Sequence, residues 1–453
     1  MASTDVLGLI GSTPVVRVKR LDTGPCELFL KLESQNPGGS IKDRIGRSMI
    51  DAAERAGLLK GERPHLVEAT AGNTGLGLAL VAAQKGYRLT LVIPDKMSRE
   101  KIFHLKALGA TVVMTRSDVE KGHPEYYQDV AERLAREEGA HYVNQFANPA
   151  NPLAHQVTTG PEILSQLEGR IDAMVCGVGS GGTITGLSRY FARAAPACEM
   201  VLADPVGSVL AGYVMTGTLG TAGSWLVEGI GEDFLPPICD LSRVSRAYSV
   251  PDRESLDTAR TVLRSEGVLV GSSSGTLIAA ALRYCREQER PKRVCTLVCD
   301  SGSKYLSKMF DDGWMSDQGF VDRASTGDLR DVVARRHAEG AVVTVGPADS
   351  LLVAYGRMKL HGISQLPVME AGKVIAIIDE SDLLLAATDD PARFREPVRD
   401  VMSKRLETIP VGAAIDQVMP MFASGLIPVV MDGAEFVGLL TRTDLLDHLR
   451  RKL

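Results

Sequence analysis

Short runs of hydrophobic, often β-branched residues alternate with segments of helical periodicity from the start of the chain to about Phe320. The apolar runs predict strands at 66–69, 89–93, 112–114, 173–176, 201–203 and 295–298. The segments between them predict helices at 76–84, 101–108, 184–191 and 277–285. Strands that are apolar on both faces and separated by helices are typical of a largely parallel sheet covered on both sides. The pattern therefore predicts an α/β fold that binds ligands beyond the carboxyl ends of its strands.

A stretch with the sequence Pro-Gly-Gly-Ser-Ile-Lys-Asp-Arg, at residues 37–44, precedes another predicted helix. Ser40 can cap this helix, which places Lys42 in its first turn. The positive end of the helix macrodipole disfavours the ammonium form of a lysine at that point. Such a position suits a lysine that acts as an amine nucleophile. We treat Lys42 as a candidate catalytic residue, with an ordinary surface lysine as the alternative.

A second motif, Thr-Ala-Gly-Asn-Thr-Gly at residues 70–75, lies between a predicted strand and the helix that follows it. Its backbone N–H groups could bind a carboxylate at the start of that helix. Asn73 adds an amide that could hydrogen-bond a ring hydroxyl. The alternative is an ordinary turn between a strand and a helix.

Residues 177–183, Gly-Val-Gly-Ser-Gly-Gly-Thr, also follow a strand and precede a helix. Four glycines permit a close approach of the backbone, and Ser180 and Thr183 supply hydroxyls, which is typical of a phosphate-binding loop. The loop is not a Walker A motif, because no Gly-Lys-Ser/Thr follows, and no acidic residue is placed as in a dinucleotide fingerprint. A phosphate on a smaller molecule fits better.

The third such junction, Gly-Ser-Ser-Ser-Gly-Thr at residues 271–276, follows the apolar run at 268–270. A serine hydroxyl there can hydrogen-bond a ring nitrogen, and a serine-rich helix cap is the alternative. Taken together, a nucleophilic lysine, a carboxylate-binding turn, a phosphate loop and a hydroxyl for a ring nitrogen describe one ligand. That ligand is pyridoxal phosphate joined to an amino acid.

Residues 4 to about 318 resemble the β-family of pyridoxal-phosphate enzymes, which includes cysteine synthases and cystathionine β-synthases. Six segments carry the resemblance in the same order: Gly-Ser-Thr-Pro at 11–14, then 40–44, 70–75, Asn-Gln-Phe at 144–146, 179–183 and 271–275. The resemblance implies a two-subdomain, fold-type II pyridoxal-phosphate enzyme with mostly parallel sheets.

The resemblance also implies a role for each matching residue. Lys42 would link to the cofactor aldehyde, Asn73 would bond the ring hydroxyl, and Ser273 would face the pyridine nitrogen. The phosphate would be held by Gly179, Ser180, Gly181, Gly182 and Thr183. The substrate carboxylate would be bound by Thr70, Ala71, Gly72, Thr74 and Gln145. A serine at the ring nitrogen, in place of an aspartate, favours β-replacement over transamination.

Glu228 indicates which β-replacement is involved. The segment Glu-Gly-Ile-Gly-Glu-Asp-Phe at 228–234 is similar to cystathionine β-synthases, whereas cysteine synthases tend to carry glutamine at its first place. A carboxylate near the β-carbon suits a hydroxyl leaving group and a cationic second amino acid. Residues 204–208 agree with this interpretation, but 158–163 are more similar to a cysteine synthase. A salt bridge that orders a loop is the alternative role for Glu228.

An internal repeat follows a polar segment. Pro367 and Pro428 are 61 positions apart, and Asp382 and Asp444 are 62 apart, a period long enough for a ββα unit with an added helix. Neither copy could bury its sheet alone, so we expect the copies to pack as a pair. The repeat resembles the tandem CBS (Bateman) module, an α/β module that binds adenosyl ligands.

The second copy keeps the Gly-x-x-Thr-x-x-Asp of that module at 438–444, where Thr441 and Asp444 would bind ribose hydroxyls. The first copy has Ala376 in place of the glycine and Asp379 in place of the threonine, and an aspartate repels phosphate. We therefore expect at most one working regulatory site per chain, with S-adenosylmethionine, AMP and ATP all open as ligands. A purely structural or dimer-forming pair is the alternative.

The arrangement as a whole is similar to that of cystathionine β-synthases. It predicts a catalytic region at 1–318, a linker at 319–334 and CBS-type repeats at 335–394 and 395–453. The resemblance implies a homodimer that condenses L-serine with L-homocysteine to L-cystathionine and water. We expect no haem, because Lys42 lies too near Met1 for the haem segment of some members. The alternatives are a cysteine synthase that uses O-acetylserine and sulfide, and an adenosine-ligand sensor with a vestigial catalytic half.

Composition restricts the partners, the cellular location and the metal binding that the chain can be expected to have. The formal net charge of -5 and the pI near 6.0 argue against nucleic acid or an anionic membrane as a partner. The chain shows neither a basic N-terminal segment followed by an apolar run nor a long apolar stretch, so we expect a cytoplasmic protein. The seven cysteines include no Cys-x-x-Cys, and we expect free thiols and no metal site.

Overall fold

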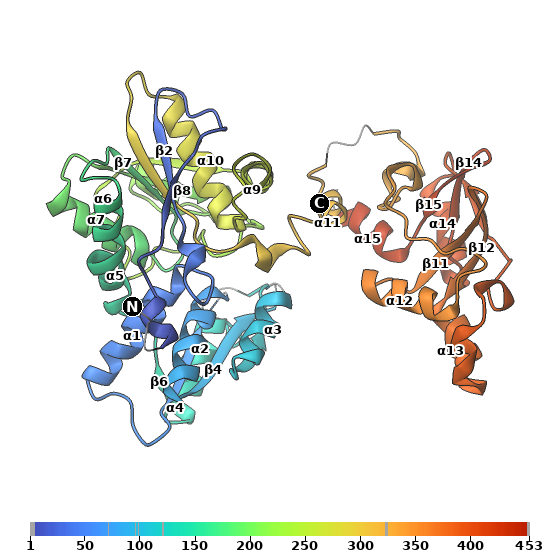
Figure 1. Cartoon of the computed structure of the whole chain (residues 1–453), viewed down its shortest axis with the longest axis horizontal. Helices are drawn as coiled ribbons and strands as arrows, with labels where there is room; N and C mark the ends of the chain where they lie inside the picture. Colours follow the sequence, from blue (N-terminus) through green and yellow to red (C-terminus); the bar gives the residue numbers. More distant parts are fainter. Residues whose placement is uncertain are drawn as a thin grey trace. The chain divides into compact units, whose positions relative to one another are not determined.

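A computed structural model of the chain describes residues 5–70, 72–95, 97, 99–119, 122–321 and 325–450. Contacts divide the chain into two units, residues 1–309 and 310–453 (Figure 1). The first unit holds two largely parallel sheets, and the second holds two small sheets, each with helices beside them. The predicted α/β class is therefore confirmed in both parts of the chain.

The larger sheet of the first unit has six strands in the order β1-β2-β10-β7-β8-β9. Every neighbouring pair is parallel except β1 with β2. The strands are β1 (Val15–Arg17), β2 (Glu27–Lys31), β10 (Arg293–Leu297), β7 (Ala173–Cys176), β8 (Glu199–Pro205) and β9 (Val244–Val250). Apart from one residue at its start, β2 is buried, and β7 is buried throughout, as expected for strands covered on both faces.

The smaller sheet of the first unit has four parallel strands in the order β5-β4-β3-β6. They are β5 (Thr111–Thr115), β4 (Arg88–Pro94), β3 (His65–Ala69) and β6 (His141–Tyr142). The apolar run at 268–270 forms no strand, and only Val270 makes an isolated bridge, to Ser301. The helices of this unit are α1 (Lys42–Arg55), α2 (Asn73–Lys85), α3 (Arg99–Ala107), α4 (Tyr127–Glu137), α5 (Ala150–Ala154), α6 (Gly160–Gln166), α7 (Gly182–Ala194), α8 (Leu210–Thr216), α9 (Asp252–Glu266) and α10 (Ser272–Arg286).

Two glycines let α1 and α2 pack unusually close together. A Cβ added to Gly77 of α2 would lie 2.5 Å from the backbone oxygen of Lys42, and one added to Gly46 of α1 would lie 2.7 Å from the backbone of Gly77. Because α1 begins at Lys42, this close crossing sets the start of α1 against α2 at Gly77.

The second unit contains two copies of a helix–strand–strand–helix pattern. The first copy comprises α12 (Leu351–His361), β11 (Gln365–Glu370), β12 (Lys373–Asp379) and α13 (Glu380–Asp389). The second comprises α14 (Ile415–Ala423), β14 (Val429–Asp432), β15 (Glu435–Leu439) and α15 (Arg442–Arg450), with β13 (Thr408–Pro410) added to its sheet. Ile377 of the first copy packs with Val429 and Phe436 of the second, so the copies share a core, as expected for a pair.

The last residues of the predicted linker belong to that second copy. Leu329, Val332 and Val333 are buried in its core beside Ile409 and Val418. The segment is mostly polar, but these three apolar residues are buried, so this part of it packs against the second copy.

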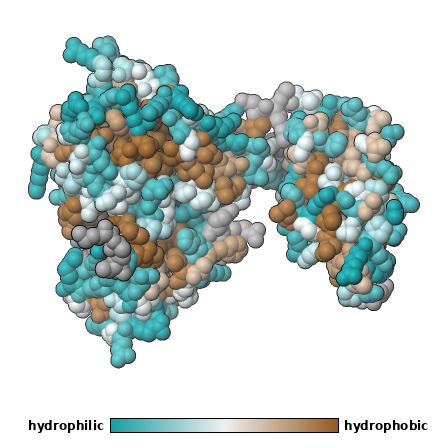
Figure 2. Space-filling view, viewed as in Figure 1, coloured by the Kyte–Doolittle hydropathy of each residue, from teal (hydrophilic) through white to brown (hydrophobic). Residues whose placement is uncertain are grey.

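Apolar side chains reach the surface in both units, where Figure 2 shows brown patches among hydrophilic ones. In the second unit, Leu360, Leu384, Leu385 and Leu446 are each exposed by 66–79%. Among the described residues, no helix combines the length and apolar character needed to cross a membrane.

Candidate active site

Lys42 is the first residue of α1, and its surroundings disfavour a charged amine. The Ser40 hydroxyl accepts a hydrogen bond from the Lys42 N–H at 3.2 Å, but Ile41, not the predicted Ser40, is the N-cap residue of the helix. Asp43 folds back to accept the N–H of Gly38, which closes the loop before the helix. Burial lowers the pKa of Lys42, although Cys299, Asp300 and Glu232 act in the opposite direction. A larger share of the amine is therefore neutral than for a lysine in water.

Arg44 anchors the helix that carries Lys42. Its guanidinium contacts Glu33 at 2.7 and 2.8 Å and Glu162 at 2.7 Å through two nitrogens. Burial alone would raise the pKa of Glu162, but Arg44 and Lys31 hold it at about 2. Two carboxylates from different segments are thus fixed on one side chain two positions after Lys42.

Asn73 is the first residue of α2, and both the nitrogen and the oxygen of its side-chain amide make hydrogen bonds. Its nitrogen donates to Asp300 at 2.7 Å, and its oxygen accepts from the ammonium of Lys304 at 3.0 Å. Tyr305 also donates to Asp300 at 2.7 Å. The predicted contact of Asn73 with a ring hydroxyl stays a prediction.

The predicted phosphate loop leads directly into α7, which begins at Gly182. Gly181 has a φ of +86°, and a Cβ at Gly182 would lie 1.8 Å from the amide oxygen of Asn151. The Ser180 hydroxyl accepts from the Asn151 amide at 2.9 Å. The Thr183 hydroxyl lies 3.2 Å from Nε2 of a histidine on the preceding helical segment. Only glycine fits where this loop turns, so its N–H groups stay accessible at the helix start.

That histidine, His155, begins a π-helical turn (His155–Thr159) and is fully buried. Its Nδ1 lies 3.0 Å from the Thr159 hydroxyl. Burial, together with the charges of Lys42 and Arg44, lowers its pKa well below the ordinary value, so the ring is neutral. No motif pointed to His155, and the sequence offers no local signal for it.

The three serines at the start of α10 have different partners. Ser272 accepts the N–H of Glu228 at 3.1 Å, and Ser274 accepts the N–H of Cys299 at 2.9 Å. Ser273 is buried and hydrogen-bonds the Cys299 thiol. The outer serines therefore hold neighbouring segments in place, while Ser273 lies beside Cys299, which interacts with Lys42.

The turn predicted to bind the substrate carboxylate is built around Thr70. Its hydroxyl accepts the N–H groups of Gly72 and Gly75 at 3.1 and 3.2 Å, and Gly72 has a φ of +120°. Thr74 donates to the side-chain oxygen of Gln145 at 2.7 Å. Ala71 lies outside the described residues. The structure brings the other four predicted residues together, and their contact with substrate stays a prediction.

Glu228 takes part in an ion-pair network that joins three segments of the first unit. Its carboxylate contacts Lys101 of α3 at 2.8 Å and Lys308 at 2.7 Å. Burial alone would raise the pKa of Glu228, but the two lysines lower it. Lys101 is 1% exposed and also donates to Tyr305. The alternative role of Glu228 as an ion-pair partner is therefore observed, and its contact with substrate stays a prediction.

Several residues of this site carried no sequence motif, namely Lys101, Asp300, Lys304, Tyr305 and Lys308. One signal existed for Asp300: it lies two residues after the strand predicted at 295–298, at the end where ligands bind. The remaining four lie on segments whose approach to the site depends on tertiary packing.

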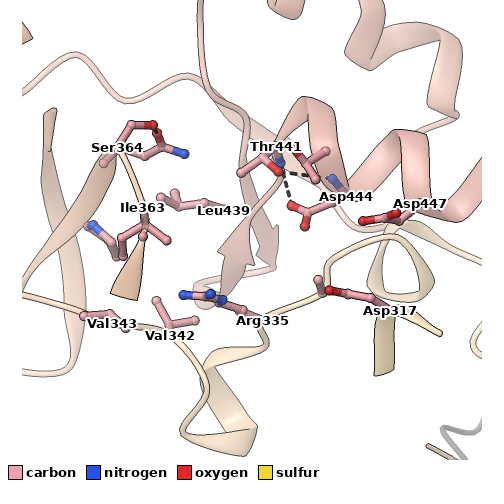
Figure 3. Close-up of a pocket in the computed structure, with 15 residues that line it drawn as sticks. Asp317, Arg335, Val342, Val343, Ile363, Ser364, Leu439, Thr441, Asp444 and Asp447 are labelled. Carbon is pink, nitrogen blue, oxygen red and sulfur yellow. Dashed lines mark hydrogen bonds between the residues drawn. The ribbon is translucent and has the colours of Figure 1, made fainter. Parts of the chain in front are cut away.

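The second unit contains a cavity of about 300 Å³ between its two repeats. Thr441 and Asp444 lie on its wall and bond each other: the Thr441 N–H donates to the Asp444 carboxylate at 2.7 Å, and the Asp444 N–H donates to the Thr441 hydroxyl at 3.2 Å. Figure 3 shows apolar side chains at one end of this cavity and carboxylates at the other, with Arg335 between them. Burial raises the pKa of Asp444.

The comparisons with known proteins agree with this division of the chain. A family model described as pyridoxal-phosphate dependent enzyme matches residues 6–300, and a CBS domain model matches 330–389 and 398–451. A cystathionine beta-synthase of Dictyostelium discoideum is 36% identical over 99% of this chain and 92% of its own length. That of Saccharomyces cerevisiae is 33% identical over 98% of this chain and 97% of its own.

A solved structure, that of an O-ureido-L-serine synthase, gives a TM-score of 0.64 at 32% identity. It matches over 72% of this chain and 98% of the other.

Proposed function

The chain belongs to the cystathionine beta-synthases, within the pyridoxal-phosphate-dependent enzymes, and we propose that the residues gathered around Lys42 carry out the reaction of that family. The enzyme condenses L-serine with L-homocysteine to L-cystathionine and water. One observation carries this assignment: the similarity to the cystathionine beta-synthases runs through the catalytic region and both CBS domains.

The residues of the site fit pyridoxal phosphate. A Cβ at Gly179 would lie 2.7 Å from the backbone oxygen of Gly229, and Gly182 is equally intolerant of a side chain. These positions leave a cradle of N–H groups at the start of α7, which suits a phosphate dianion. Asn73 and Ser273 supply neutral hydrogen-bonding groups for a ring hydroxyl and a ring nitrogen. When bound, the cofactor supplies an electron sink for the α-carbon of the amino acid.

Lys42 would hold the cofactor and then move protons. Its pKa is lowered by burial, so its amine can accept the α-proton of bound serine without first losing one to solvent. The resulting ammonium can return the proton to the departing β-hydroxyl, which leaves as water. The thiol of homocysteine then bonds to the β-carbon and gives up its proton, which Lys42 can pass to the α-carbon.

The substrate carboxylate would be bound at the turn that Thr70 organises, with Thr74 and Gln145 beside it. Glu228 lies next to Ser272, one residue from the serine assigned to the ring nitrogen. We propose that it contributes to the binding of the second amino acid, held at a defined position by its two lysines.

The reaction assignment can be tested with purified protein supplied with pyridoxal phosphate. We expect cystathionine formation from serine and homocysteine at a higher kcat/KM than cysteine formation from O-acetylserine and sulfide. Lys42→Ala should abolish both activities and the visible absorbance of bound cofactor. Equal activity of the Lys42→Ala variant, or a clear preference for O-acetylserine with sulfide, would contradict the assignment.

For the second unit, we propose regulation by an adenosyl ligand in the cavity between the repeats. Apolar residues at one end suit an adenine ring, and the paired Thr441 and Asp444 suit ribose hydroxyls. Asp317, Asp444 and Asp447 face a single cation, Arg335, in the lining. This balance of charge favours S-adenosylmethionine over the polyphosphate of ATP.

Calorimetry with S-adenosylmethionine, AMP and ATP tests this proposal. Asp444→Ala should weaken binding of the ligand. Asp382→Ala is the matched control, because Asp382 makes the corresponding capping interaction with Asp379 in the first repeat but does not line the cavity. Equal loss of binding in both variants would place the ligand elsewhere.

We also propose a cytoplasmic homodimer. The exposed leucines of the second unit, such as Leu360 and Leu385, are apolar surface that a second copy could cover. All seven cysteines are free thiols, which suits a reducing compartment. Sedimentation of the whole protein should give twice the chain mass, and a monomer at micromolar concentration would contradict the proposal.

A further inference from the structure

A second lysine, Lys304, lies buried in the core of the candidate active site. It is 8% exposed and belongs to the short helical turn Gly302–Tyr305 that follows β10. Its ammonium donates to the backbone oxygens of Gly38 and Gly39 at 3.3 and 3.1 Å and to the side-chain oxygen of Asn73 at 3.0 Å. The three donors of this ammonium thus have three acceptors, all of them neutral.

These contacts determine which way the Asn73 amide faces. A lysine ammonium can only donate, and an ionised carboxylate can only accept. With Lys304 on one side and Asp300 on the other, the amide has one satisfying orientation: oxygen toward Lys304 and nitrogen toward Asp300. The opposite orientation would place two acceptors together and two donors together.

That orientation has a consequence for a bound ring. The Asn73 nitrogen carries two N–H groups, and Asp300 takes one of them. The second remains to donate to an oxygen in the site. An amide that could flip freely would turn its oxygen toward the ring hydroxyl about as often as its N–H. An oxygen cannot donate a hydrogen bond, so it cannot stabilise a phenolate.

We propose that Lys304 is a positioning residue of the cofactor site, which, together with Asp300, holds Asn73 so that an N–H faces the ring hydroxyl of pyridoxal phosphate. The proposal rests on the proposed function, because it requires the cofactor to bind beside Asn73. Lys304 also fixes the carbonyls of Gly38 and Gly39, in the loop that precedes Lys42. The effect of Lys304 on cofactor binding is expected to run through Asn73.

The experiment measures the Kd of pyridoxal phosphate for the apo-protein and the pH dependence of the visible absorbance of the loaded protein. Lys304→Met should raise the Kd about tenfold or more, since hydrogen bonds to charged groups are among the stronger ones. It should also shift the pH dependence of the absorbance, a readout that a purely structural role would leave unchanged. Lys304→Arg, which keeps a cationic donor, should restore most of both properties. Lys19→Met removes an exposed lysine of the same unit and should match the wild type.

A double-mutant cycle shows whether Lys304 acts through Asn73. Asn73→Ala alone should weaken cofactor binding, and adding Lys304→Met to it should change the Kd by less than about twofold. If Lys304→Met binds the cofactor as tightly as the wild type, or if the two effects add in full, the proposal is wrong. Should Lys304→Met fail to fold, Lys304→Gln replaces it in the same cycle. Failure of the wild type to bind pyridoxal phosphate would instead overturn the proposed function.

Discussion

Replacing Arg44 with methionine should destabilise the first unit strongly. The Arg44 side chain is 2% exposed and its partner Glu33 is 0% exposed, so their ion pair is shielded from water. Arg44→Met keeps most of the apolar volume but leaves the Glu33 carboxylate buried without its cation. Removing one partner of a buried pair costs about 3–5 kcal/mol, most of which is the penalty of the uncompensated charge that remains.

Arg47 provides the matched control on the same helix. Its side chain is 43% exposed, and its pair with Asp51 has an N–O distance of 3.5 Å. Exposed pairs contribute about 0–1 kcal/mol, so Arg47→Met should cost far less than Arg44→Met.

Urea unfolding can report this difference for the first unit alone. The chain has two tryptophans, Trp225 in the first unit and Trp314 in the second. In a Trp314→Phe background the fluorescence of Trp225 reports the unfolding of the first unit alone. The unfolding of the two units then need not be treated as a single transition. We expect the free energy of unfolding to fall by about 3–5 kcal/mol for Arg44→Met.

The pH dependence offers an independent check on the same cluster. Because the pKa of Glu162 is held at about 2, its stabilising contribution is complete above pH 4.5 and is lost as the pH falls toward 2. Arg44→Met should reduce this acid sensitivity. If Arg44→Met and Arg47→Met unfold at the same urea concentration, the ion pairs of Arg44 do not anchor the helix.

Three further predictions concern single positions. Burial raises the pKa of Glu68 to about 8, so between about pH 4.5 and 8 the folded chain holds a proton on Glu68 that the unfolded chain has lost. The free energy of unfolding should therefore fall as the pH rises through this range. Glu68→Gln should remove this pH dependence in urea titrations. Gly182→Ala should raise the Kd of pyridoxal phosphate at least tenfold, because the added Cβ would displace Asn151. Gly212→Ala is the control: a Cβ there meets nothing within 4 Å, so the Kd should stay unchanged. Thr74→Val should raise the KM for serine about tenfold with little effect on cofactor absorbance, and an unchanged KM would exclude Thr74 from substrate binding.

Much of the fold and of the site followed from local sequence. The alternation of apolar runs and helical segments predicted the parallel strands, because a strand buried on both faces must be apolar throughout. Glycine and hydroxyl residues placed directly after strands indicated the predicted phosphate loop and the turn around Asn73. The repeat in the second unit was visible because each copy keeps the same proline and aspartate positions.

The partners of these residues could not be predicted in the same way. Lys304 lies 231 positions from Asn73 in the sequence, and Lys101 lies 127 positions from Glu228. Nothing local distinguishes these lysines from surface ones, since their burial depends on how segments far apart in the chain pack against each other.

The sequence by itself thus determined which chemical groups stand at the ends of strands and starts of helices, since capping, glycine turns and apolar periodicity act over a few residues. Only the tertiary structure decided which charged side chains lie next to those groups. The close crossing of α1 and α2 at Gly46 and Gly77 sets the backbone of Lys42 against Gly77, and burial of the Lys42 side chain lowers its pKa. Desolvation and charge pairing depend on the whole surroundings of a side chain, and those exist only once the chain has folded.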